Sequence, residues 1–153
     1  MTGNKLDIAI AGAGIGGLAA AALLAADGHN VVVFDQFAEP LPVGSGLVIQ
    51  PVGQDVLAQI GALESAVNSG SRITRMLGHE ADNGRRGLDV WYDRTGGGHR
   101  GFFGLAIHRA ALFRAIHKAA LRAGAQIVPD ARVTTASAGL LTLADGRQEG
   151  RST

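Results

Sequence analysis

Residues 6–35, LDIAIAGAGIGGLAAAALLAADGHNVVVFD, decide the fold of this 153-residue chain. An apolar run at 8–11 leads into a glycine-rich turn at 12–17, then into an Ala/Leu segment that ends at Gly28, and then into a second apolar run at 31–34. Short apolar runs on either side of a longer Ala/Leu segment are typical of a strand, a helix and a second strand. The stretch therefore predicts a βαβ unit with a tight turn after its first strand.

The turn itself has a GxGxxG pattern, and each glycine has a separate expected role. Gly12 allows a sharp exit from the strand, Gly14 removes the side chain that would keep a diphosphate from the backbone, and Gly17 lets the helix pack closely on the sheet. The first turn of a helix offers unpaired N–H groups and a partial positive charge, so it can hold an anion without a basic side chain. The pattern predicts a dinucleotide site built from main-chain atoms.

A lone acidic residue, Asp35, closes the second apolar run. It lies about 20 residues beyond the glycines, where an acid accepts hydrogen bonds from the ribose of an adenine dinucleotide. Taken alone, Asp35 also fits a solvated carboxylate at a strand end, and the glycines alone fit a close-packed corner without a ligand. The glycine turn, the helix and the acid occur together in this order, which favours a nucleotide site over both alternatives.

Length and composition indicate one folded domain. A chain of 153 residues can bury about two-thirds of its unfolded surface, and 46% hydrophobic with 18% charged residues excludes a disordered composition. Fourteen Lys and Arg, scattered among 13 Asp and Glu, do not suggest a nucleic-acid partner. The absence of cysteine excludes disulfides and thiolate metal sites and is compatible with a cytoplasmic location. The uncharged run 8–26 is explained by the glycine turn, so we expect neither a membrane span nor an export signal.

Further elements are expected beyond Asp35. They are a short helix at 51–60, two antiparallel strands within 72–93 around a polar turn, a short strand at 101–104, a helix at 108–123, a strand at 126–128 and a hairpin at 132–142. The strand at 126–128 can extend the parallel sheet, because a helix precedes it. Residues 147–153 are polar and show no pattern.

Two more segments accompany the turn and Asp35, namely VGSGLVIQP at 43–51 and IHRAALF at 107–113. In this order and at this separation, the segments resemble the N-terminal part of the FAD-dependent aromatic-ring hydroxylases of the p-hydroxybenzoate hydroxylase type. The resemblance spans nearly the whole chain. It implies an α/β fold, in which a Rossmann-like FAD-binding βαβ sheet carries part of an antiparallel substrate-domain sheet.

The resemblance also implies a division of the chain and a set of cofactor contacts. Residues 1–70 and 105–153 would form two FAD-binding parts, the second truncated, and residues 71–104 a partial antiparallel layer. The loop at 44–46 would pass the flavin, Arg109 would bind the phosphate and ribityl region, and the backbone at Val133 would face the adenine. A guanidinium suits phosphate because it stays charged and binds two oxygens at once; the alternative for Arg109 is a surface charge. The cofactor-binding residues so assigned are Gly12, Ala13, Gly14, Ile15, Gly16, Gly17, Asp35, Gly44, Ser45, Gly46, Arg109 and Val133.

The implied reaction is NAD(P)H-driven hydroxylation of a small organic, aromatic substrate. The sequence departs from the family at Asp35, where glutamate is usual, and it lacks the later GADG-type and GD-containing segments. We therefore expect an N-terminal fragment with weak FAD retention and negligible NAD(P)H oxidation. Two alternatives stay open: an NAD(P)-dependent Rossmann oxidoreductase, favoured by Asp35, and a non-catalytic remnant, favoured by the missing segments.

Other chemistry finds less support in the sequence. His108 and His117 are nine residues apart, on opposite sides of a helix, so zinc is not expected. No nucleophile elbow is present, and we name no catalytic residue. The acids around the polar turn are expected to be solvated: Glu80, Asp82, Asp89 and Asp93. Trp91 and the aromatic pair at 102–103 fit a core at least as well as a substrate pocket. No oligomeric state is indicated.

Overall fold

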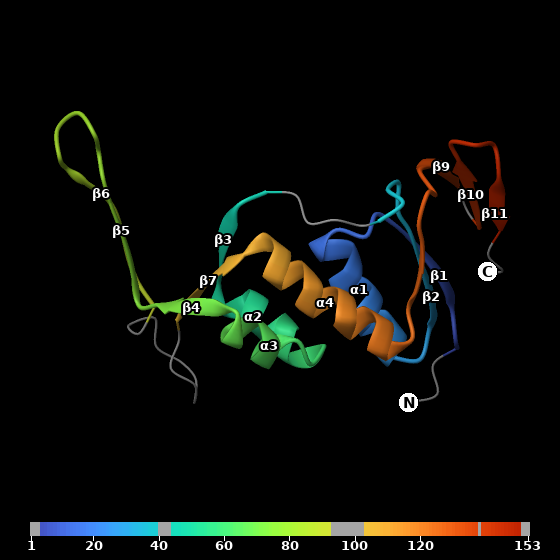
Figure 1. Ribbon diagram of the computed structural model, residues 1–153, viewed down its shortest axis with the longest axis horizontal. Coiled ribbons are helices and arrows are strands. Elements are labelled where there is room, and N and C mark those ends of the chain that lie inside the picture. Colours follow the sequence, from blue (N-terminus) through green and yellow to red (C-terminus); the bar gives the residue numbers. More distant parts are fainter. Residues whose placement is uncertain (1–3, 40–43, 93–102, 138, 151–153) are drawn as a thin grey trace.

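The computed structural model describes residues 4–39, 44–92, 103–137 and 139–150. A parallel sheet with the strand order β1-β2-β8 lies at one end of the molecule (Figure 1). Its strands are β1 (Asp7–Ala11), β2 (Asn30–Phe34) and β8 (Gln126–Val128), and the helix α1 (Ile15–Ala26) connects the first two. The predicted βαβ unit is confirmed, as is the addition of residues 126–128 to it.

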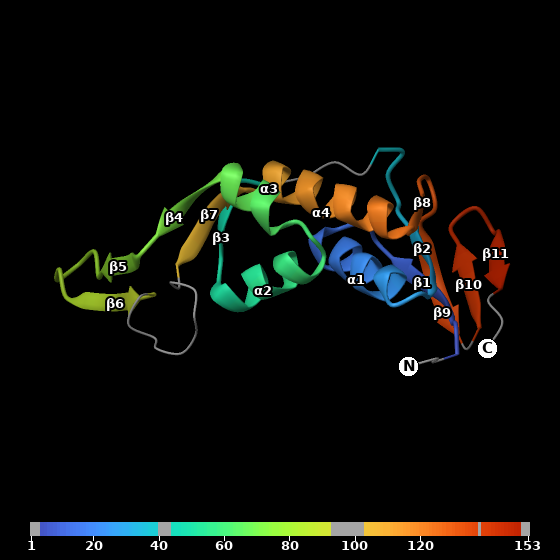
Figure 2. The same ribbon diagram turned by 90° about the horizontal axis from the view of Figure 1, so that it is seen from below.

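Two helices cover one face of the parallel sheet. The helix α4 (Arg109–Ala123) packs against α1, and both place their apolar side chains in one core with the sheet (Figure 2). Small residues are common among their buried side chains, which include Ala21 and Ala22 of α1 and Ala119 of α4. Alanine allows helix axes to approach closely, which explains why a segment so rich in alanine forms a buried helix.

The other face of the parallel sheet meets a second, antiparallel sheet of the strands β9 (Val133–Ser137), β10 (Leu140–Leu143) and β11 (Gln148–Gly150). A small separate core fills the space between them. Its buried members are Val32, Phe34, Ala131 and Leu143. The sheet is therefore covered on both sides, as the long apolar run of β2 requires.

A third sheet with the order β3-β7-β4 extends the molecule away from the parallel sheet (Figure 1). It contains β3 (Gly46–Ile49), β7 (Gly104–His108) and β4 (Gly70–Ile73), all antiparallel to their neighbours. The helices α2 (Pro51–Gln59) and α3 (Leu63–Asn68) follow β3 in the chain. Leu57, Ala66 and Leu105 from this part belong to the same core as α1 and α4, so one apolar interior joins the two sheets.

The hairpin of β5 (Arg75–His79) and β6 (Arg86–Trp91) projects from this end of the molecule (Figures 1 and 2). It forms a two-stranded sheet of its own. Arg75 makes a two-point ion pair with Asp89 and lies 4.3 Å over the Trp91 ring. The antiparallel strands expected within 72–93 are confirmed.

The structure corrects the sequence-based elements in several places. The strand expected at 101–104 is instead Gly104–His108, and residues 101 and 102 lie outside the described part. The tail, expected to be unpatterned, contributes β11, which pairs with β10. An edge strand that gains only main-chain hydrogen bonds needs no apolar alternation, so the pattern did not reveal it. The helix α3 was also missed. The domain limits at residues 70 and 104 stay a prediction.

In the described part of the chain, no helix is both long and apolar enough to span a membrane.

Candidate nucleotide-binding site

The glycine turn is held tightly at two of its glycines. Gly12 has a φ of +99°, in the left-handed region that other residues avoid, and its N–H donates to the carbonyl oxygen of Phe34 at 2.7 Å. A Cβ added at Gly17 would lie 2.1 Å from the carbonyl oxygen of Gly12. The fold itself therefore requires glycine at both positions, which fits the roles that the sequence assigned to them.

Gly14 differs from these two glycines. Its φ of −73° suits any residue, and a Cβ added there would meet no atom of the protein within 4 Å. Neither backbone strain nor internal packing explains a glycine at this position. The open space beside its backbone fits a molecule that approaches the main chain, as a diphosphate does in this motif.

The start of α1 is available to an anion. Gly14 is the N-cap residue, and the first helical hydrogen bond runs from the N–H of Leu18 to the carbonyl oxygen of Gly14 at 2.9 Å. No side chain caps this helix start, and its first turn contains no acid. The N–H groups of Ile15, Gly16 and Gly17 thus lie where a helix has no acceptors of its own, at the positive end of its dipole.

Asp35 lies beneath the glycine turn and is 7% exposed. One carboxylate oxygen, Oδ2, accepts from the N–H of Ala13 at 2.7 Å, and the other, Oδ1, accepts from the N–H of Phe37 at 3.0 Å. Asp35 therefore joins the end of β2 to the turn that follows β1. It is not the solvated strand-end carboxylate that remained as an alternative.

A cavity of about 210 Å³ opens where β1 and β2 end and β9 begins. Gly12, Asp35 and Val133, three residues assigned to the cofactor from widely separated parts of the sequence, share its wall. Gln36 and Arg132 line it as well, although no sequence motif predicted a role for them. Ligands of open α/β sheets bind in this place, at the carboxyl ends of the strands.

The loop at 44–46 and Arg109 also lie together. The N–H of Arg109 donates to the carbonyl oxygen of Ser45 at 3.1 Å, and Gly46 pairs with His108 across β3 and β7. A Cβ added at Gly44, which has a φ of +110°, would lie 3.4 Å from Cδ of Arg109. The two segments that carry the family resemblance are therefore in direct contact.

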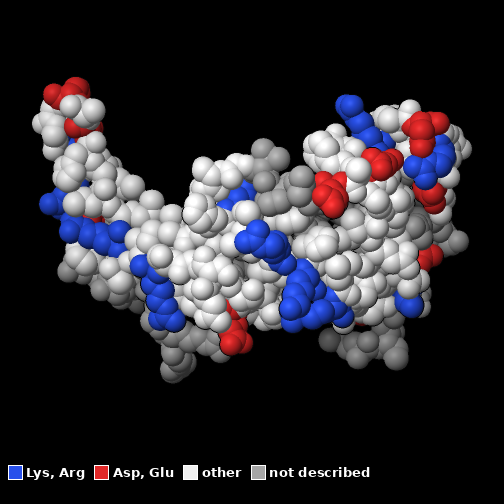
Figure 3. Space-filling view, viewed as in Figure 1, with Lys and Arg blue, Asp and Glu red and all other residues white. Residues whose placement is uncertain are grey.

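The charge around Arg109 is unevenly distributed. The helix α4 carries Arg109, Arg114, Lys118 and Arg122 and no acid, and none of these side chains forms an ion pair with another described residue. Figure 3 shows a run of Lys and Arg across the middle of the molecule, with further Lys and Arg beside Asp and Glu at both of its ends. No acidic residue of α4 itself therefore offsets its four basic side chains.

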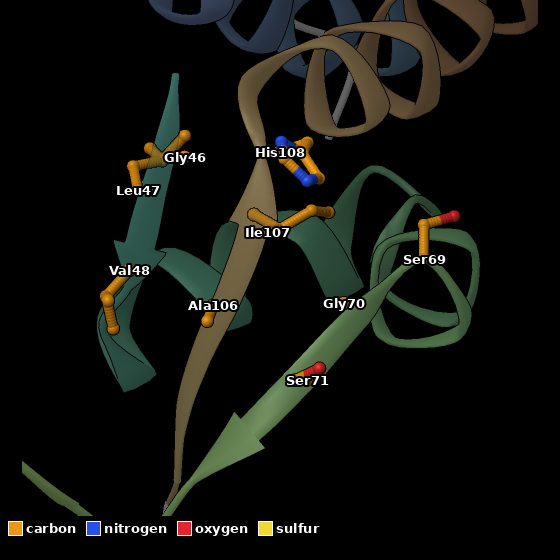
Figure 4. Close-up of a pocket in the computed structure, with 9 residues that line it drawn as sticks. All are labelled: Gly46, Leu47, Val48, Ser69, Gly70, Ser71, Ala106, Ile107 and His108. Carbon is orange, nitrogen blue, oxygen red and sulfur yellow. The ribbon is translucent and has the colours of Figure 1, made fainter.

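A second, larger cavity of about 380 Å³ lies over the sheet β3-β7-β4 (Figure 4). Val48, Ala106 and Ser71 stand side by side across its floor, because they pair in register on the three strands. Gly46 and His108 at one end belong to the loop and helix junction just described. This cavity was not predictable from the sequence, since three small residues far apart in the chain form no local motif.

Several residues that were considered for other chemistry lie in the described part of the chain. In the described residues no three His, Cys, Asp or Glu side chains cluster to hold a metal ion. Asp89 forms ion pairs with Arg75 at 2.7 Å and with Arg86 at 2.8 Å. The hydrogen bond from Arg75 is the main cause that holds the pKa of Asp89 below its usual range, and the charges of both arginines add to it. Guanidinium groups lie over both Trp91 and Phe103, each at 4.3 Å. His99, Asp93 and Phe102 lie outside the described residues.

By its parallel sheet and glycine turn the chain is a Rossmann-like dinucleotide-binding protein. Comparison with protein families narrows this class. Residues 5–139 match the FAD binding domain family, and the chain belongs to that family, whose cofactor is FAD. The open space at Gly14 and the cavity beside Asp35 and Val133 fit such a cofactor.

Curated relatives are aromatic hydroxylases and monooxygenases. The phenazine 1,6-dicarboxylic acid hydroxylase PhzS of Lysobacter antibioticus is 37% identical over 98 residues, 62% of this chain and 23% of that protein. The 6-hydroxynicotinate 3-monooxygenase of Bordetella bronchiseptica is 31% identical over 79% of this chain and 31% of its own length. The 3-hydroxybenzoate 6-hydroxylase 1 of Aquipseudomonas alcaligenes is 33% identical over 80% of this chain and 33% of its own length.

A solved structure confirms the fold. The tetrameric form of 2-methyl-3-hydroxypyridine-5-carboxylic acid oxygenase superposes with a TM-score of 0.82 at 22% identity, over 97% of this chain and 38% of that one. The chain thus spans between 23% and 38% of the length of these four proteins. It corresponds to the FAD-binding domain of flavin monooxygenases.

Proposed function

We propose that this chain supplies the FAD-binding portion of a monooxygenase that hydroxylates a small aromatic substrate at the expense of NAD(P)H. The observation that carries the proposal is Gly14, a glycine that the protein's own packing and backbone do not need. The names of the curated relatives support an aromatic substrate, since three of them are hydroxylases or monooxygenases of aromatic acids.

Each part of the cofactor has a proposed place. The diphosphate lies on the N–H groups at the start of α1, from Ile15 to Gly17, where the helix dipole favours negative charge. The adenosine fills the cavity of about 210 Å³ beside Val133. The flavin end runs toward the loop at 44–46, and the Arg109 guanidinium, free of ion pairs in the described part of the chain, adds a cation there.

FAD, when bound, supplies the redox chemistry, and the chain's residues bind and orient it. The larger cavity over β3-β7-β4 begins at Gly46 and His108, beside the proposed flavin end, and its floor of Val48, Ala106 and Ser71 is small and mostly apolar. A flat ring can lie over such a floor without a steric clash. We propose this surface as one wall of the substrate site. A cytoplasmic location, expected from the sequence, stays a prediction.

The test is ligand binding by titration calorimetry, with FAD and NAD⁺ added separately to the purified chain. We expect FAD to bind and NAD⁺ to bind at least about tenfold more weakly. Gly14→Ala should weaken FAD by a further tenfold or more, because its methyl group occupies the proposed diphosphate position. Arg109→Ala should weaken FAD, whereas Arg114→Ala, which removes an exposed arginine from the same helix, should not.

Three results would contradict the proposal. Tighter binding of NAD⁺ than of FAD would favour a nicotinamide-dependent oxidoreductase. Binding of neither ligand by the folded chain would favour a non-catalytic remnant. Equal FAD affinity in Gly14→Ala and the unaltered chain would place the diphosphate elsewhere.

A further inference from the structure

We propose that a polar cavity between α3 and α4 binds a small phosphate monoester, at a site separate from the nucleotide site. This α3–α4 cavity has a volume of about 380 Å³ and is lined by α3, by the turn before α3 and by α4. It shares no lining residue with the cavity beside Asp35, and only Ser69 with the cavity over β3-β7-β4. The inference goes beyond the proposed function and does not depend on FAD.

The wall that α4 contributes to this cavity is basic. Lys118 and Arg122 both line it, and the small side chain of Ala115 lies one turn before Lys118. Residues four apart are neighbours on one helix face, and two like charges at this spacing destabilise a helix slightly. Within the described ranges of the chain, neither cation forms an ion pair with an acid. An anion in the cavity would relieve their mutual repulsion.

Arg122 is held in place by the protein itself. Its Nη2 donates to the carbonyl oxygen of Gly61 at 3.0 Å, which joins the last turn of α4 to the turn between α2 and α3. A guanidinium has five N–H donors, and this hydrogen bond uses one of them. The remaining donors belong to a side chain whose position is already ordered. Such preorganisation lowers the entropic cost of binding a ligand.

The opposite wall, from α3, adds uncharged donors. Ser65 and Ser69 line the cavity with hydroxyl groups and Asn68 with a carboxamide, and both kinds of group can donate to phosphate oxygens. Glu64 is the one acid among the described residues that line the cavity. A carboxylate only accepts hydrogen bonds, so Glu64 suits a hydroxyl on the organic part of a ligand and not its phosphate.

The donors and the size of the cavity favour a phosphate monoester over a carboxylate. A phosphate group has three acceptor oxygens and about −1.5 to −2 charges, so it can contact Lys118, Arg122 and a hydroxyl of α3 together. A carboxylate has fewer oxygens and a single charge, and it would leave one cation without a counter-charge. A cavity of about 380 Å³ also has the size of a pocket for a small organic molecule, which gives room for the ester part.

An NMR titration of the full chain with glycerol 3-phosphate tests the site. We expect saturable shifts of the amide signals of Ser65, Asn68 and Ser69, with a Kd of about 1 mM or tighter. Acetate at the same ionic strength should bind at least about tenfold more weakly. Shifts confined to residues 15–17 would place the anion on the glycine turn alone and would overturn the proposal. Acetate binding as tight as that of glycerol 3-phosphate would also overturn it.

Substitutions on α4 separate a built site from general attraction to a basic helix. Lys118→Gln should weaken glycerol 3-phosphate about tenfold, because it removes a charge-assisted hydrogen bond. Lys118→Arg, which keeps the charge, should retain binding. Arg114→Gln is the matched control, since it removes an exposed charge of α4 outside the cavity, and the affinity should stay within about twofold. Equal weakening in Lys118→Gln and Arg114→Gln would overturn the proposal. Lys118 is exposed, so both of its variants should fold.

Excess FAD distinguishes this site from the nucleotide site. We expect FAD to leave the affinity for glycerol 3-phosphate unchanged, because the α3–α4 cavity and the cavity beside Asp35 have no lining residue in common. Displacement of glycerol 3-phosphate by FAD would overturn the proposal. If FAD does not bind the chain, the proposed function fails, while the comparison of Lys118→Gln with Arg114→Gln still decides the phosphate site.

Discussion

The glycine turn at 12–17 and the β5–β6 hairpin are both short segments of the chain, but they are stabilised by different contacts. In the turn, main-chain atoms from distant residues fix the geometry, through the bonds from Gly12 to Phe34 and from Ala13 to Asp35. In the hairpin, the two strands contact each other and leave Leu77 and Leu88 more than two-fifths exposed. Tolerance to substitution should therefore differ sharply between these two regions.

The largest effect is expected from Gly17→Ala in the turn. One added methyl in a packed interior costs about 1–3 kcal/mol when neighbouring side chains can move. Here the neighbour is a main-chain carbonyl oxygen at 2.1 Å from the new Cβ, so we expect a cost beyond that range and loss of most folded protein. Far-ultraviolet circular dichroism and urea unfolding measure it. Gly14→Ala, with no atom within 4 Å of its Cβ, is the control and should remain folded.

A smaller effect is expected where α1 meets the core. Leu18 directly follows the turn and is fully buried, so Leu18→Ala should lower the free energy of unfolding by about 3 kcal/mol through lost burial and a residual cavity. Urea denaturation gives the value. A cost below about 1 kcal/mol would mean that the turn and its helix are packed no more firmly than the surface.

In the hairpin, replacing a leucine by alanine should hardly change the free energy of unfolding. Leu88 is 43% exposed, and Leu88→Ala is expected to change the free energy of unfolding by about 0.5 kcal/mol or less. The same denaturation series provides the comparison with Leu18→Ala. A cost as large as that of the core variant would show that the apolar face of the hairpin is covered in solution, and that the hairpin tolerates substitution no better than the glycine turn.

The smallest effect on stability is expected from removing an ion pair of the hairpin. The pKa of Asp89 is held below its usual range, first by the hydrogen bond from Arg75 and then by the charges of Arg75 and Arg86. The stabilisation is present above the ordinary aspartate pKa and is lost as the pH falls through the lowered value. Arg75→Ala should raise the pKa of Asp89 toward its ordinary value in a carbon-detected NMR titration. The pKa of Asp145, lowered by Arg147 through a backbone hydrogen bond first, should not move.

The parts of the fold that were predictable from sequence depend on local patterns. Glycine spacing and apolar runs are enough to predict β1, α1 and β2, because each role lies within a few residues of the chain. The family resemblance assigned the loop at 44–46 and Arg109 to the same cofactor, but the hydrogen bond between the main chains of Arg109 and Ser45 was not predicted.

What the sequence did not reveal depends on contacts between distant residues. The hydrogen bond from the N–H of Ala13 to Asp35 joins positions 22 residues apart, and neither residue type predicts it. The floor of the larger cavity combines Val48, Ser71 and Ala106, whose alignment is set by strand register. The polar segment that forms β11 pairs with β10 through its main chain, and a pattern of side chains does not predict such pairing.

The junction of β7 and α4 has a mechanical consequence. The strand ends at His108 and the helix begins at the next residue, Arg109, while the main chain of Arg109 is tied to Ser45. No spare residue exists there to absorb a hinge motion. The main chain at the start of α4 is thus continuous with the floor of the larger cavity, so a group bound by that main chain and a molecule on the floor would keep a nearly constant spacing.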